Sequence, residues 1–393
     1  MAFLSCSQKD TKTERTREAY SPEIDLDRND QVSIADFVES TDVVQLETTD
    51  SCFIKRIDKI IYDNDRYYVF DREQAMLFCF DSLGKLLFKI NSKGQGPEEY
   101  LTLDGFDIDN YNQQLLLIEP FGHLLTFDLN GKFISKIRLP QHPPAYNEVY
   151  ALDKDKVLLL SATEKQLFYF SRGKNEMLDV YNLGFNDIKS TLNLTSIFRR
   201  IYQFDETLFY TNAVYDRIIN LSDTTGSRWD FGEMTNAEKQ INSLLDEYKR
   251  EITIEKFDRD KTLREASADH VAKKKLHYEL FLCHETSRYK ICFLYRGNHR
   301  ISHIFYDKKN GSYSVFDKTN ENIEFRFNPV FSGESLIQNS FAGFSFYLNP
   351  GNYQSVLNAK WFDRELLTEE QRAIIDSHQE DDNPYLIKYN FKQ

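Results

Sequence analysis

Two stretches of the chain that lie 47 residues apart carry nearly the same pattern. Residues 76–90 read MLFCFDSLGKLLFKI, and residues 124–137 read LLTFDLNGKFISKI. Each stretch has two apolar runs joined by a polar turn, which contains Gly84 in the first and Gly131 in the second. Glycine readily adopts the positive φ angle that a tight hairpin turn requires. The sequence therefore predicts a repeated β-hairpin unit rather than two unrelated domains.

Weaker copies of this unit follow toward the carboxyl end. Each has two apolar strand patterns and then a turn with glycine: residues 157–160, 167–170 and Gly173; residues 207–211, 217–221 and Gly226; residues 289–295, 301–306 and Gly311. Four short strands in about 40 to 50 residues are typical of a β-propeller blade. Single cores stop growing near ~250–300 residues, so a repeat also suits the length of this chain. We expect an all-β fold, a six-bladed β-propeller of four-stranded antiparallel blades over residues 41–393.

The sixth blade is interrupted in the sequence. Its second strand is predicted at residues 344–348 and its third at residues 385–391, and no outer strand follows. Near the other end of the chain, residues 42–48 contain a strand pattern without a sequence neighbour. An exposed sheet edge invites aggregation, and closing the ring removes it. We therefore expect residues 42–48 to complete the sixth blade.

Helical patterns interrupt the strands twice, at residues 233–279 and 352–381. Thr235 and Thr368 begin capping boxes, and apolar residues follow each at three- and four-residue steps. In the blade scheme both insertions leave from the same end of the sheets. We expect two helical insertions on one face, where they form lids over one mouth of the central channel.

The amino terminus resembles the end of a lipoprotein signal peptide, since residues 1–6 form a short apolar piece that ends in Cys6. Residues 7–40 are polar and predict a tether. The resemblance implies that Cys6 is lipidated, although five preceding residues are too few for a charged region and an apolar core. The alternative is an ordinary frayed terminus. No run approaches the ~20 apolar residues of a membrane-spanning helix, so the only membrane contact expected is a lipid anchor.

Charge and cysteine usage narrow the partners and the compartment. The net charge is −13, and no basic cluster is present, which argues against nucleic acid as a partner. Apart from Cys6, the four cysteines are an even number, as disulfides in an oxidising compartment would require: Cys52, Cys79, Cys283 and Cys292. Cys79 lies in an apolar strand pattern that favours a buried free thiol.

Several short motifs resemble those of the six-bladed β-propeller proteins, often lipoproteins, that are common in Bacteroidetes and distantly similar to NHL-repeat propellers. They are Leu46-Glu-Thr-Thr49, Ile57-Asp-Lys-Ile60, the GxGPxEY stretch of residues 94–100, and Asn383-Pro384. The resemblance implies the six-bladed fold and an envelope location, and it does not imply a catalytic activity. A strand pattern follows GxGPxEY where a phosphate loop would have a helix, so we interpret its glycines as turn residues and Tyr100 as packing between blades.

Candidate site residues lie in the loops between second and third strands, on the predicted lid side. They are Arg72, Glu73, Glu119, His123, Glu164, Tyr215, Arg296 and His299. Such polar and aromatic side chains around a pore suit a polar ligand. The alternative is that these loops are solvated turns without a common ligand. His299 and His303 make half a zinc site at most, and residues 107–112 are better explained as a hairpin turn than as a calcium loop. We expect no metal and no cofactor.

The predicted function is that of a lipid-anchored protein of the cell envelope, in the outer membrane, which binds a polar ligand at the lidded mouth. A glycan, a peptide, another small polar molecule or an envelope protein are the expected partners. One alternative is a hydrolase or lyase that acts on carbohydrate in the channel, with Glu73 and either Glu119 or Glu164 as acid and base. No GxSxG or Cys/His arrangement supports nucleophilic catalysis. A scaffold for envelope protein assembly is the other alternative.

Overall fold

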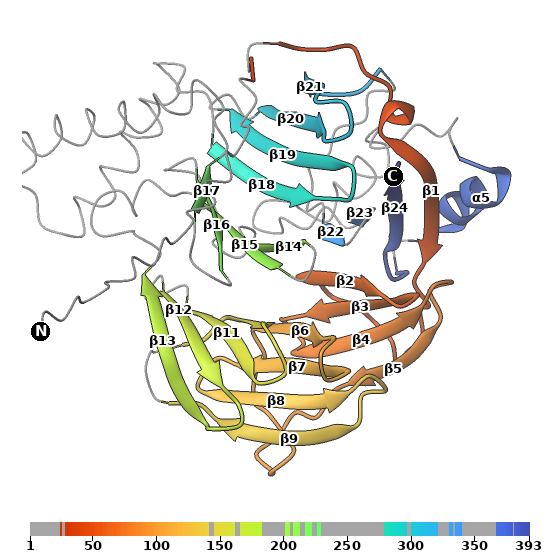
Figure 1. Ribbon diagram of the computed structural model, residues 1–393. Coiled ribbons are helices and arrows are strands. Elements are labelled where there is room, and N and C mark those ends of the chain that lie inside the picture. The colour runs from red at the N-terminus through yellow and green to blue at the C-terminus, as the bar shows by residue number, and fades with distance from the viewer. Residues whose placement is uncertain are drawn as a thin grey trace, which may run out of the picture.

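A computed structural model describes residues 24–25, 28–140, 145–161, 166–182, 201–204, 207–212, 217–221, 226–228, 279–296, 300–320, 330–332, 335–339, 367–379 and 381–393. These residues form six four-stranded antiparallel sheets, one α-helix and one 3-10 helix. The first strand of each sheet lies toward the middle of the molecule and the fourth lies outside (Figure 1). The fold is therefore all-β and similar in arrangement to a β-propeller.

The sheets are numbered 1 to 6 here, and each is given from its inner to its outer strand. Sheet 1 is β2 (Lys59–Asp63), β3 (Arg66–Asp71), β4 (Met76–Asp81), β5 (Leu86–Ile90); sheet 2 is β6 (Gly105–Asp109), β7 (Gln114–Glu119), β8 (His123–Asp128), β9 (Phe133–Arg138); sheet 3 is β10 (Glu148–Ala151), β11 (Lys156–Ser161), β12 (Gln166–Ser171), β13 (Glu176–Asn182). Sheet 4 is β14 (Ile201–Phe204), β15 (Thr207–Asn212), β16 (Arg217–Asn220), β17 (Gly226–Arg228); sheet 5 is β18 (Glu279–Glu285), β19 (Tyr289–Arg296), β20 (Arg300–Asp307), β21 (Tyr313–Phe316); sheet 6 is β22 (Val330–Ser332), β23 (Ser335–Asn339), β24 (Tyr385–Phe391), β1 (Val38–Gln45).

The two copies of the 47-residue repeat form equivalent hydrogen bonds in their turns. In sheet 1, Asp81 Oδ1 accepts hydrogen bonds from two backbone N–H groups of the turn at 2.9 Å each. In sheet 2, Asp128 Oδ1 accepts two equivalent bonds, also at 2.9 Å. Gly84 and Gly131 have φ angles of 83° and 81°, and Gly311 in sheet 5 has 73°. A side chain would strain a backbone with such a positive φ angle. The turn role that was predicted for these glycines is therefore confirmed.

Two predicted boundaries are wrong. Gly226 is the first residue of β17 and does not lie in the turn before it. The second strand of sheet 6 is β23, Ser335–Asn339, whereas the segment predicted for it, residues 344–348, lies outside the described residues. The apolar pattern of residues 344–348 predicted that second strand, whereas the observed pairing places it nine residues earlier in the sequence.

Six clusters of buried apolar side chains lie between neighbouring sheets. Representative pairs, from sheets 1 and 2 round to sheets 6 and 1, are Phe70 with Phe106, Leu116 with Val157, Leu160 with Tyr210, Tyr202 with Leu294, Phe305 with Phe391, and Leu386 with Val69. Burial of such surface contributes roughly 25 cal/mol per Å². Tyr100 of the GxGPxEY stretch is buried between sheets 1 and 2, so its predicted packing role is confirmed.

Sheet 6 is completed by a strand from the amino-terminal region. β1 runs antiparallel to β24, with Val43 opposite Ile387. This confirms the expected pairing, although the strand spans Val38–Gln45 rather than residues 42–48. β24 consequently has a neighbour on both sides.

Asn383, just before β24, fastens this junction with its side chain. Its Oδ1 accepts the Ile54 N–H at 2.7 Å, and its Nδ2 donates to the carbonyls of Glu47 and Cys52 at 2.7 Å each. The residue is fully buried. One amide therefore satisfies three backbone groups of the connection between β1 and β2, which gives the Asn383-Pro384 motif a structural role.

Part of the predicted tether belongs to the folded body. Val32, Ile34 and Phe37 are buried in the cluster between sheets 5 and 6, and η1 (Ile34–Asp36) lies there. Asp30 donates its N–H to the Val315 carbonyl at 2.7 Å. Because these apolar side chains are buried, the tether that was predicted for residues 7–40 ends well before residue 40.

The helix α5 (Glu369–Ser377) begins at the capping box of Thr368 and Gln371, as expected. Its Gln371 Nε2 donates to the Thr41 carbonyl of β1 at 2.7 Å, and Ile374 and Ile375 pack toward the cluster between sheets 5 and 6. The helix lies beside the outer strand β1 rather than over the inner strands (Figure 1). Residues 233–278 of the other predicted insertion lie outside the described residues, and residue 279 begins β18.

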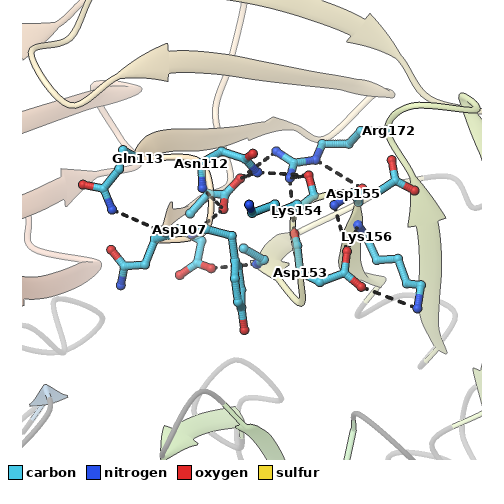
Figure 2. A network of polar contacts seen from close by, with 12 residues as sticks. Asp107, Asn112, Gln113, Asp153, Lys154, Asp155, Lys156 and Arg172 are labelled. Carbon is cyan, nitrogen blue, oxygen red and sulfur yellow. Dashed lines mark hydrogen bonds and ion pairs between the residues drawn. The ribbon is translucent and has the colours of Figure 1, made fainter.

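A network of polar contacts joins sheets 2 and 3 at the β6–β7 and β10–β11 turns (Figure 2). Asp109 is fully buried, and its carboxylate accepts from Asn112 Nδ2 at 2.8 Å and from Arg172 at 2.7 Å. Arg172 also donates to the Lys154 carbonyl at 2.6 Å. Residues 107–112 therefore form the expected strand end and turn, and their carboxylate serves a link between sheets.

Candidate functional site

The predicted site loops and the beginnings of the first strands lie at the same end of the sheets, which we call the loop end. In sheet 1, Lys59 at the start of β2 is paired with Phe70, one residue before the loop that contains Arg72. In sheet 3, Glu148 at the start of β10 is paired with Leu160 near the end of β11. Polar residues at the start of an inner strand can therefore meet the predicted loop residues.

Lys59 is the centre of a polar cluster at the loop end. Its Nζ donates to the Phe106 carbonyl at 2.7 Å and to Glu148 Oε2 at 3.3 Å. The ammonium also lies 4.8 Å from the ring centroid of Tyr150 and 5.4 Å from that of Phe106. The side chain is 22% exposed, while that of Glu148 is 6% exposed. Three consecutive sheets thus contribute to the surroundings of one partly exposed cation, because Lys59 of β2 contacts residues of β6 and β10.

Two buried carboxyl groups accompany Lys59. Burial raises the pKa of Asp107 to about 6, although the nearby Lys59 and the Ala151 N–H, 2.9 Å from Asp107 Oδ2, act against this rise. Burial also raises the pKa of Glu148, against the opposing effects of Lys59 and Arg72. The pKa of Tyr150 is raised well above its ordinary value by burial, with the two carboxyl groups adding to the shift. A carboxyl group with a raised pKa keeps its proton to a higher pH than an exposed carboxyl group does.

Arg72 is the predicted site residue that the structure brings to this cluster. Its guanidinium donates to the Asp104 carbonyl at 2.8 Å, and Asn147 Nδ2 donates to Asp104 Oδ2 at 2.7 Å. Asn147 directly precedes Glu148 at the start of β10. Arg72 is therefore linked through Asp104 to the strand that carries Glu148.

The other described candidates lie apart from Lys59. Glu73 is exposed and lies 3.5 Å from Lys55 Nζ. Glu119 Oε2 is buried and lies 2.6 Å from His123 Nδ1 and 3.7 Å from Lys136 Nζ. Glu73 and Glu119 thus have different partners, and the described contacts do not bring them together as an acid and base pair.

The side chains of five candidates cannot be placed. Glu164, Tyr215, His299 and Cys6 lie outside the described residues, as does the Arg296 side chain. His303 is fully buried, its Nδ1 lies 3.1 Å from the Phe316 carbonyl, and its ring stacks on Phe316. Among the described residues, no three His, Cys, Asp or Glu side chains are grouped as metal ligands would be.

Exposed apolar side chains also occur in the connections at the loop end. Phe53 and Phe121 are 47% and 75% exposed, and Leu101 is 56% exposed. Phe121 belongs to the loop between β7 and β8, and Phe53 belongs to the connection before β2. Aromatic faces near charged groups are typical of sites for ligands that have both polar and apolar surfaces.

Sequence reasoning missed Lys59, Asp107, Glu148 and Tyr150 because it searched loops. The available signal was charge inside an otherwise apolar strand, as in the Gly-Phe-Asp-Ile-Asp run of β6. Ionisable groups are seldom buried unless they are paired. Strand charges of this kind therefore point to a shared polar cluster, although the sequence does not show which strands meet.

Comparisons with known proteins identify relatives but no activity. A family described as "Domain of unknown function (DUF4934)" matches residues 21–390. No curated protein matches the chain. A crystal structure of BF0058 from Bacteroides fragilis NCTC 9343, assigned as an exported protein, has a TM-score of 0.64 at 15% identity and covers 93% of this chain and 98% of its own. This similarity shows a shared fold.

Two further solved structures are more distant. BamB from Moraxella catarrhalis has a TM-score of 0.39 at 12% identity and covers 75% of this chain and 72% of its own. The WD40 β-propeller domain of Doa1 has a TM-score of 0.32 at 7% identity and covers 44% of this chain and 53% of its own. Within the described part of the chain, no helix is both long and apolar enough to span a membrane.

Proposed function

Because the chain belongs to the DUF4934 family, which has no assigned activity, we propose its function from the cluster around Lys59: it binds a polar ligand, a glycan or a peptide, at the loop end. The observation that carries this proposal is the placement of one partly exposed ammonium among two buried carboxyl groups and Tyr150. Hydroxyl or amide groups of a ligand can both donate to the carboxylates and accept from Lys59.

We further propose that the six sheets form a closed six-bladed propeller. The clusters between neighbouring sheets support this, since they run from sheet 1 through sheet 6 and the last one joins sheet 6 to sheet 1. In such a ring the inner strands β2, β6 and β10 line the central channel at the Lys59 cluster. A helical lid remains part of this proposal for residues 233–278 alone, because residue 279 begins β18 and α5 lies against β1.

The proposed location is the cell envelope, with a lipid anchor at Cys6. The fold shared with BF0058, assigned as an exported protein, supports the location. The test of the anchor is metabolic labelling with a fatty acid in a bacterial host that lipidates its own lipoproteins. Labelling of the wild type and its loss in Cys6→Ala support the anchor, and equal labelling of both proteins contradicts it.

The binding proposal is tested by glycan and peptide arrays on the purified full chain, followed by calorimetry on any compound bound. We expect Lys59→Gln and Arg72→Gln to weaken binding at least tenfold. The matched control is Lys156→Gln, which removes an exposed lysine paired with Asp153 at the opposite end of sheet 3. Equal affinities of the wild type and Lys59→Gln, measured at a temperature at which both are folded, would contradict the proposal.

A hydrolase or lyase acting on carbohydrate is the second candidate. The observation in its favour is the raised pKa of both Asp107 and Glu148, because a general acid must hold its proton near neutral pH. Turnover of the bound glycan that is abolished in Glu148→Gln and retained in Lys156→Gln would favour the enzyme. Binding without turnover would favour a binding protein.

A further inference from the structure

Two cysteines face each other across neighbouring strands of sheet 5. Cys283 on β18 is directly opposite Cys292 on β19 in the antiparallel register. Their Sγ atoms lie 3.0 Å apart, and both residues are almost completely buried. The two sulfur atoms are thus already oriented toward each other inside the core between sheets 4 and 5.

The backbone geometry of this pair suits a disulfide. Directly opposed residues in an antiparallel ladder have Cα atoms about 4.5 to 5.5 Å apart. Disulfides require Cα separations of about 4.4 to 6.8 Å, so no strand has to move. Only the sulfur atoms must approach further, which small side-chain rotations accomplish.

The remaining described cysteines have no such partner. Cys52 is buried between sheets 6 and 1, where its Sγ lies 3.7 Å from Asn383 Nδ2. Cys79 is buried between sheets 1 and 2. The two belong to different core clusters, and neither belongs to the cluster of Cys283 and Cys292. Cys52 and Cys79 are therefore internal controls within the same chain.

We propose that Cys283 and Cys292 form a disulfide that joins β18 to β19 when the chain folds in an oxidising compartment. The oxidant is a protein disulfide or a small-molecule disulfide. One cysteine thiolate attacks the oxidant and forms a mixed disulfide, and the thiolate of the second cysteine then displaces the oxidant's sulfur. Two electrons pass to the oxidant, which leaves as two thiols, and two protons leave the cysteines.

The exchange takes place before the two strands are packed. Burial raises the pKa of the Cys292 thiol well above its ordinary value, and the thiol is not exposed to an oxidant in the folded protein. The reactive form is the thiolate, so the open chain reacts and the folded chain protects the product. β18 follows a long connection from β17, and the bond would fix it to its neighbour.

Peptide mapping of the full chain tests this proposal. The protein is exported into an oxidising compartment of an expression host, denatured in the presence of an alkylating agent and digested without reductant. We expect alkylated Cys52 and Cys79, and a single linked species that contains Cys283 and Cys292 and separates on reduction. Alkylation of Cys283 and Cys292 without reduction would overturn the proposal, as would a bond from either of them to another cysteine.

A second measurement distinguishes the bond from accidental oxidation. Because a disulfide restricts the unfolded chain, the melting temperature of the wild type is expected to fall by about 2 °C or more when the protein is unfolded, reduced and refolded in the presence of reductant. The same treatment should not change the melting temperature of the Cys283→Ala/Cys292→Ala variant. The matched control, Cys52→Ala/Cys79→Ala, should retain the fall. A wild type that does not respond to reductant would contradict a stabilising bond.

Discussion

Lys59 and Glu148 are 89 residues apart in the sequence, yet Lys59 Nζ lies 3.3 Å from Glu148 Oε2. The pair joins the inner strand of sheet 1 to that of sheet 3, across the Phe106 carbonyl of sheet 2. Because the pair lies among buried groups, the stability of the folded protein should be sensitive to the loss of either partner.

We predict that Lys59→Met lowers the free energy of unfolding by about 2 kcal/mol, because two buried carboxyl groups lose their cation. Adding Glu148→Gln to this variant should recover part of the loss. Lys156→Met, which removes an exposed ion pair, should cost less than ~1 kcal/mol. Urea unfolding of the four proteins at pH 7.5 measures these differences. Equal losses of unfolding free energy for Lys59→Met and Lys156→Met would show that Lys59 does not stabilise the buried carboxyl groups.

The raised pKa of Asp107 predicts a pH-dependent stability. The folded protein holds this proton up to about pH 6, whereas the group in the unfolded chain releases it near its ordinary value of 3.8. The folded state therefore binds more protons between about pH 4 and 6, so the contribution of Asp107 to stability falls as the pH rises through this window. At pH 7.5 the cost is on the order of 3 kcal/mol.

Asp107→Asn removes this cost and keeps an oxygen that can accept the Ala151 N–H. We expect the variant to be more stable than the wild type at pH 7.5 and the advantage to shrink as the pH falls to about 4. Urea unfolding across that range provides the measurement. An advantage that does not change with pH would mean that Asp107 titrates in its ordinary range.

Asn383→Ala is predicted to destabilise the protein by about 3 kcal/mol. The substitution leaves the Ile54 N–H and the Glu47 and Cys52 carbonyls without their partner in the interior, and each such loss costs about 1 kcal/mol or more. Asn383→Asp can accept the first bond but cannot donate the other two, so it should also destabilise. Thermal and urea unfolding would reveal the effect, and a loss below ~1 kcal/mol would argue against this role.

Gly84→Ala tests how closely the first repeated turn approaches β1. A Cβ atom at Gly84 would collide with the Gln45 carbonyl, and the residue has a φ of 83°. We expect a loss of about 2 kcal/mol or more. Gly122→Ala is the control, since Gly122 has a φ of 102° but its Cβ would meet its nearest neighbour at an ordinary 3.6 Å. The difference between the two variants in urea unfolding isolates the contact with β1.

The repeat was predictable because it is local. Gly84, Gly131 and their turn aspartates follow patterns within a few residues, and such patterns fix a hairpin before any tertiary contact forms. The pairing of the amino-terminal strand with β24 was predictable for another reason: a repeated sheet with one strand missing needs one from elsewhere, and residues 42–48 contained the unused pattern.

The candidate site was predictable only in part. Arg72 was found because it lies in an inter-strand loop, and it does reach the Lys59 cluster through Asp104. Lys59, Asp107 and Glu148 were missed because each strand alone gives no information about which strands become neighbours. Their pKa shifts and contacts arise from three sheets meeting, a relation that no single stretch of sequence contains.

The pairing of β1 with β24 makes the order of synthesis important. Ser40 and Asn390, which contact each other at this junction, are 350 residues apart. Closing a flexible loop of that length costs roughly 5 kcal/mol of chain entropy, and none of this cost is offset until β24 has been synthesised and can pair with β1. Sheet 6 therefore has an open edge for as long as β24 is missing, and deletion of residues 385–393 should produce a protein that assembles with other copies of itself.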